Sequence, residues 1–162
     1  MSEYPLVFTV HDAIAGNGFL AGVTMSGRGL MVKEDDLWWM HGVRPAAITA
    51  KGETPAGAYL EFRSALTAAL VDAAVEAANF EGFKAEVERF FYERDEAEER
   101  RWHEAGDAIR QGRVVPEPPF TALKREAPDV RPVVISIERL DQQRVFTASD
   151  NVLETYALSA AA

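Results

Sequence analysis

An apolar stripe that recurs every three to four residues over about five helical turns constrains this chain more than any other feature. Its members are Tyr59, Phe62, Leu66, Leu70 and Ala73 or Ala74. Thr54 and Pro55 precede the stripe. They favour a helix start, because threonine caps free backbone N–H groups and proline at the first helical position loses no hydrogen bond. A helix with one such face must bury it, and we expect a sheet to cover it.

Two runs of β-favouring residues precede the helix and can form that sheet. In the first, Leu6, Phe8 and Val10 alternate with their neighbours, which is typical of a strand. Residues 15–18, Ala-Gly-Asn-Gly, follow and favour a tight turn, because Asn and Gly tolerate positive φ. A second strand from Phe19 to about Met25 should therefore pair antiparallel with the first. Residues 46–50 predict a third strand.

Residues 26–45 are harder to interpret, because glycines separate two apolar islands on either side of an acidic run. We expect a long excursion there, with one short strand or one turn of helix at most. Trp38 and Trp39 are two of the three tryptophans and lie in this segment. They either cover the core or anchor a partner, since large aromatic rings on loops are enriched at interfaces.

Further helix and a β-containing tail follow the long helix. Asn79 and Asp95 have the positions of helix caps, and Gly112 that of a helix stop, but the pattern leaves open whether residues 80–111 form one helix or two. Residues 114–119 are proline-rich and predict a linker. Residues 133–137 predict a strand, and residues 145–148 a possible second one.

The expected fold class is therefore α+β, with a small antiparallel sheet of three to four strands packed on one long helix, followed by further helix and the β-containing tail. Residues 1–112 should form the α+β domain with its helical extension. Residues 113–162 should form a proline-rich linker and a tail with one or two strands.

Charge and composition exclude several classes of protein. The chain has 17 basic and 26 acidic residues, for a net charge of −9, which disfavours direct nucleic-acid binding. It has no cysteine, which removes disulfides, thiolate nucleophiles and cysteine-based metal sites. No run approaches the ~18 apolar residues of a membrane helix. We expect a cytoplasmic protein with no membrane association.

The residues offer little support for catalysis. The three histidines include no pair at the i, i+4 spacing that places two metal ligands on one helix face, and no serine lies in a Gly-x-Ser-x-Gly turn. We expect no catalytic residue, no metal and no cofactor. Two alternatives stay open: a small hydrolase or nuclease-like enzyme that uses His11, Asp12 and His41 in a cleft, and a small-molecule-binding module with the tryptophans as an aromatic wall.

About half of the chain, from residue 6 to residue 91, resembles the HicB-like antitoxin family. The segments that carry the resemblance are Val7-Phe8-Thr9-Val10, Asn17-Gly18-Phe19-Leu20-Ala21, Gly52-Glu53-Thr54-Pro55-Ala56-Gly57-Ala58 and the helix behind them. The resemblance implies a small three-stranded sheet with a helix on one face, and a non-enzymatic protein that binds a small basic ribonuclease toxin. The DNA-binding region that ends many members has no counterpart in residues 113–162.

These observations predict a protein-interaction domain with an acidic surface that attracts a basic partner, and the resemblance implies that it is an antitoxin. The candidate partner-binding residues are Arg28, Glu34, Asp35, Asp36, Trp38, Trp39 and His41. We also expect a homo-oligomer, because an unpaired sheet edge invites a second subunit.

Overall fold

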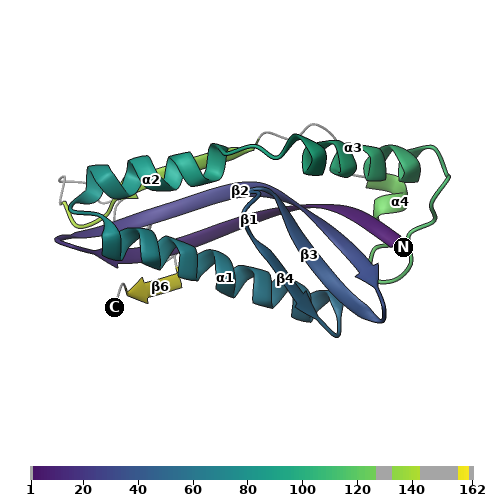
Figure 1. Ribbon diagram of the computed structural model, residues 1–162, viewed down its shortest axis with the longest axis horizontal. Helices are drawn as coiled ribbons and strands as arrows, with labels where there is room; N and C mark the ends of the chain where they lie inside the picture. The colour runs from purple at the N-terminus through teal and green to yellow at the C-terminus, as the bar shows by residue number, and fades with distance from the viewer. Residues whose placement is uncertain (1, 127–132, 143–156, 161–162) are drawn as a thin grey trace.

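The computed structural model describes residues 2–126, 133–142 and 157–160 and confirms an α+β fold. The strands are β1 (Ser2–Gly16), β2 (Phe19–Glu34), β3 (Leu37–Arg44), β4 (Thr49–Gly52), β5 (Val134–Arg139) and β6 (Ala157–Ala160). The helices are α1 (Pro55–Glu76), α2 (Phe80–Tyr92), α3 (Glu96–Arg110) and α4 (Leu123–Glu126). The sheet has the strand order β4-β3-β2-β1-β6, and β5 pairs with β2. Figure 1 shows the long strands β1 and β2 between α1 on one side and α3 on the other.

A long hairpin of β1 and β2 forms the centre of the sheet. The two strands pair antiparallel along their whole length, from Gly16 opposite Phe19 to Ser2 opposite Lys33. The predicted turn at residues 15–18 is present, because Asn17 and Gly18 connect the strands. Both strands are longer than the sequence predicts, since β2 continues well beyond Met25.

The prediction of a long excursion at residues 26–45 is wrong. This segment completes β2 and then forms β3, and the two strands pair antiparallel. Asp35 and Asp36 turn the chain with φ of 51° and 63°, the left-handed conformation that suits tight hairpin turns. The glycines of this segment lie within strands, where they leave room for neighbouring backbone. A Cβ at Gly27 would lie 2.2 Å from the Arg44 carbonyl oxygen, so no larger residue fits there. The third strand predicted at residues 46–50 is in fact the fourth strand, β4.

The long helix forms as predicted. Its N-cap is Thr54, whose hydroxyl accepts a hydrogen bond from the Gly57 N–H at 3.0 Å, and Pro55 is the first helical residue. The apolar stripe packs on the sheet through Ala58, Phe62, Leu66, Leu70 and Ala74. The same core includes the buried face of α2, with Phe80 and Phe83 in contact with Phe19.

Residues 80–110 form two helices rather than one. Asp95 caps α3 by accepting a hydrogen bond from the Glu98 N–H at 3.1 Å, and Gly112 follows the helix with φ of 73°, as expected of a stop. α3 packs on the face of the sheet opposite α1. There it builds a smaller core of Leu30, Val32, Val43, Trp102 and Ala105.

The described parts of the tail pack on the sheet. Phe120 stacks on Tyr4 with ring centroids 4.4 Å apart. The strand predicted at residues 133–137 is present as β5, which pairs antiparallel with residues 21–26 of β2. β6 runs parallel to residues 12–15 of β1. The possible strand at residues 145–148 lies outside the described residues.

Candidate functional site

All seven candidate partner-binding residues lie on the β2–β3 hairpin, but they do not share one surface. Arg28 and Glu34 belong to β2, Asp35 and Asp36 form the turn, and the other three belong to β3. Successive side chains of a strand point to opposite faces of the sheet. The hairpin therefore divides the set between the α1 face and the α3 face.

Trp38 is part of the main core on the α1 face. Its side chain is only 9% exposed, and its ring lies 5.6 Å from the ring of Phe120 and 6.2 Å from that of Tyr4. The Lys33 ammonium lies 5.7 Å from the centre of the Trp38 ring. Trp38 thus closes the core beneath the proline-rich segment.

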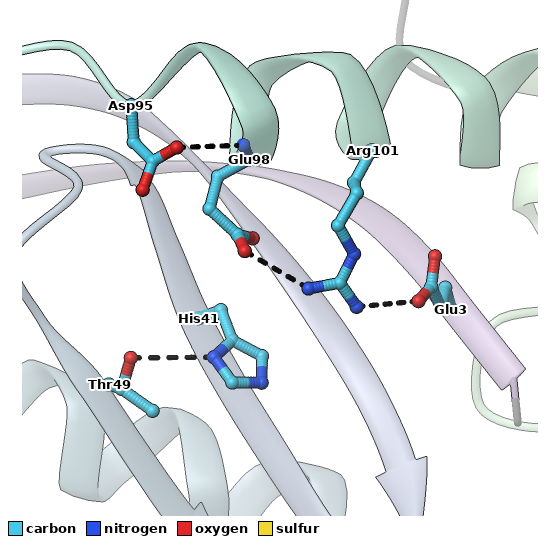
Figure 2. Close-up of polar contacts among 6 residues, drawn as sticks. All are labelled: Glu3, His41, Thr49, Asp95, Glu98 and Arg101. Carbon is cyan, nitrogen blue, oxygen red and sulfur yellow. Dashed lines mark hydrogen bonds and ion pairs between the residues drawn. The ribbon is translucent and has the colours of Figure 1, made fainter.

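Trp39 points to the other face and is half-buried. Its ring is nearly parallel to that of His41, at 10° with centroids 6.1 Å apart, and the Lys51 ammonium lies 5.5 Å from its centre. Thr49 Oγ1 lies 3.4 Å from His41 Nδ1 (Figure 2). Thr49 and Lys51 are exposed. We call these four residues, Trp39, His41, Thr49 and Lys51, the tryptophan surface.

One side of α3 borders the tryptophan surface. Figure 2 shows Arg101 of α3 between two carboxylates. The Arg101 guanidinium donates hydrogen bonds to Glu3 at 2.6 Å and to Glu98 at 3.0 Å. Burial lowers the pKa of His41, against the opposing charges of Glu98 and Glu3, which raise it. His41 is therefore less protonated at neutral pH than an ordinary histidine.

Arg28 lies beneath α3, with its guanidinium 4.6 Å from the centre of the Trp102 ring. Burial lowers the pKa of Arg28, while the charge of Glu99 raises it. Glu99 in turn accepts hydrogen bonds from Arg44 and, at 2.7 Å, from Arg94. These contacts make Arg28 and Arg44 part of the packing between α3 and the sheet.

The β2–β3 turn adds exposed negative charge beside the tryptophan surface. Glu34, Asp35 and Asp36 are all exposed. The charge of Glu34 contributes to raising the pKa of His41. The hairpin thus presents the Trp39 ring and the His41 imidazole on one face. The acidic turn lies close enough to influence the charge of His41.

The structure does not bring His11, Asp12 and His41 together. Asp12 is 2% exposed on the α1 face, where it accepts a hydrogen bond from Thr67 at 3.0 Å and lies 3.7 Å from Arg63. His11 is exposed on the opposite face. His11 and His41 pair with β2 residues six positions apart, which separates them by about 20 Å. Within the described ranges, no group of three or more His, Asp or Glu is arranged to hold a metal.

Thr49, Lys51 and the residues of α3 that border the tryptophan surface are not among the candidate residues that the sequence indicates. Lys51 lies just beyond the strand predicted at residues 46–50, but in the structure it belongs to β4 and pairs with Trp39. Thr49 and Lys51 are two positions apart, so a strand that contains both places their side chains on the same face of the sheet. The strand predicted at residues 46–50 ends before Lys51, whereas β4 includes both residues. Nothing in the sequence pairs Arg101 with Glu3, because 98 positions separate them.

Comparisons with known proteins found no matching family model, no matching curated protein and no matching solved structure. In the part of the chain that the structure describes, no helix is long and apolar enough to cross a membrane.

Proposed function

We propose that this chain is a non-enzymatic protein-interaction domain that binds a basic protein partner through the tryptophan surface and the acidic β2–β3 turn. The observation that carries the proposal is Trp39, a half-buried ring held flat against His41 on a sheet face where Thr49 and Lys51 are exposed. Tryptophan is enriched among the residues that dominate binding energy at protein interfaces.

Charge supports a basic partner. The chain carries a net charge of −9, and Glu34, Asp35 and Asp36 lie at the tip beside the tryptophan surface. Complementary charge speeds encounter and fixes orientation. The resemblance to HicB-like antitoxins supplies the specific candidate, a small basic ribonuclease toxin. The proposal also includes self-association and a cytoplasmic location, which rest on the sequence.

The experiment is affinity capture from the native lysate with the tagged full chain, followed by mass spectrometry at low and high salt. We expect a basic protein that is retained at low salt, is reduced at high salt and is lost with Trp39→Ala and with His41→Ala. Tyr92→Ala is the matched control, because Tyr92 is 50% exposed on α2, away from the tryptophan surface.

Retention of the same partner by Trp39→Ala would contradict the proposed surface. Recovery of the chain alone would contradict the proposed function, and the mass of the purified chain in solution then decides whether it self-associates. A ribonuclease assay of the recovered partner, with and without the wild-type chain, tests the antitoxin role directly.

A further inference from the structure

A groove of about 210 Å³ lies between α1 and α2. Its lining residues Leu70 and Val87 belong to the main core, whereas Trp39 packs against the smaller core under α3. The apolar floor of the groove includes Ala69, Ala73 and the half-buried ring of Phe90. Its charged side chains are all acidic, namely Asp72, Glu76 and Glu86. The groove therefore combines an apolar base with a negative rim.

The negative charge of this rim is largely uncompensated. Glu86 accepts a hydrogen bond from Arg89 at 2.6 Å. Asp72 and Glu76 form no ion pair with any cation in the described residues. α1 has no basic residue in its last turn, so the negative end of its helix dipole adds to the same potential. The Asn17 side-chain amide donates hydrogen bonds to the carbonyls of Val75 and Ala77. Because this amide is neutral, it does not cancel the negative charge of the rim.

The size of the groove indicates what it can hold. Sites for drug-sized small molecules occupy roughly 300 to 1,000 Å³, which is more than this groove offers. A hydrated metal ion gains nothing from an apolar floor. A lysine or arginine side chain fits both parts, because its methylene stem packs on alanines while its charged end meets carboxylates. The ring of Phe90 adds an aromatic surface that favours a cation.

We propose that the groove between α1 and α2 is a docking site for a cationic side chain, arginine or lysine, presented by a basic segment of a protein partner. This site is separate from the tryptophan surface, so it is an interaction beyond the proposed function. Asp72 and Glu76 supply the attraction, and the floor supplies the apolar contact.

The test is an NMR titration of the full chain with an arginine-rich helical peptide, compared with a matched peptide that has glutamine in place of arginine. We expect the arginine peptide to shift the amide signals of Ala69, Ala73 and Phe90. The double variant Asp72→Asn with Glu76→Gln should bind about tenfold more weakly, because two facing charges are lost without a change of shape.

The control variant is Glu53→Gln with Glu61→Gln, which removes the same charge from exposed positions at the other end of α1. It should bind like the wild type. Equal weakening in both double variants would show attraction to net charge alone and would overturn the proposal. Equal binding of the glutamine peptide, or shifts confined to other residues, would also overturn it. Trp39→Ala should leave the titration unchanged, which separates this test from that of the proposed function.

Discussion

At the scale of single residues, Trp38 and Trp39 are neighbours in sequence with opposite environments. Trp38 is 9% exposed among Tyr4 and Phe120, whereas Trp39 is half-buried beside His41 and Lys51. The cause is the alternation of a strand, which places consecutive side chains on opposite faces. Only one of the two rings is therefore available to a partner without disturbing the core.

This difference predicts that the same substitution destabilises the chain much more at Trp38 than at Trp39. Trp38→Ala should reduce the free energy of unfolding by about 3 to 5 kcal/mol, because it leaves a cavity in the main core. Trp39→Ala should cost about 1 kcal/mol, as is common for a partly exposed site. Urea unfolding followed by circular dichroism measures both, with Tyr92→Ala as the exposed aromatic control. Equal losses for the two tryptophans would show that Trp39 is also a core residue.

At the scale of elements, sequence patterns predicted the helices well and the strands only in part. Thr54 and Asp95 each cap the helix that the sequence assigns to them, because capping depends on residues three positions apart. Asn79 is expected from the sequence to end the long helix, but it caps the start of α2 instead. The sequence does not predict the β2–β3 hairpin, because glycines usually indicate turns. Gly27 instead leaves space for the carbonyl of Arg44, a contact across 17 positions that a local pattern does not reveal.

The candidate site was predictable to a similar extent. Trp39, His41 and the acidic turn were identified from residue type. Which tryptophan faces outward depends on where β3 begins, and that boundary was not visible in the sequence. The border with α3 depends on tertiary packing, since Trp102 donates to the Leu6 carbonyl at 3.1 Å across 96 positions.

The packing of α3 on the sheet predicts a dependence of stability on pH through His41. Burial, the largest influence, lowers the pKa of His41 from 6.5 in the folded chain. The unfolded chain then binds more protons below pH 6.5, so the contribution of neutral His41 is complete above that pH and is lost as the pH falls toward the lowered pKa. Urea unfolding at several pH values should show a smaller loss of stability on acidification for His41→Gln than for the wild type. His11 and His103 remain in both proteins and serve as an internal control, and identical pH profiles would contradict the prediction.

At the scale of the whole molecule, the described parts of the tail complete the fold that residues 1–112 begin. Phe120 covers Tyr4 and Trp38, and β5 pairs with six consecutive residues of β2. β2 thus has β1 along one edge, with β3 and β5 sharing the other. Both sides of β2 are therefore paired within the chain, so β2 itself cannot pair with another chain, whereas β4 and β6 lie at the ends of the strand order.

Phe120 directly follows the proline-rich segment, and its ring joins this part of the chain to the core. Phe120 is 8% exposed, whereas Val115 within the segment is 67% exposed. Phe120→Ala should therefore reduce stability by about 3 kcal/mol, which lowers the midpoint of thermal unfolding by about 6 to 12 °C in a chain of this size. Val115→Ala should leave the midpoint nearly unchanged. Thermal unfolding followed by near-ultraviolet circular dichroism measures both, and the Trp38 signal should weaken with Phe120→Ala even below the transition, since the two rings pack 5.6 Å apart. Equal midpoints for the two variants would show that the sheet and α1 hold Trp38 in place without Phe120, and would contradict the prediction.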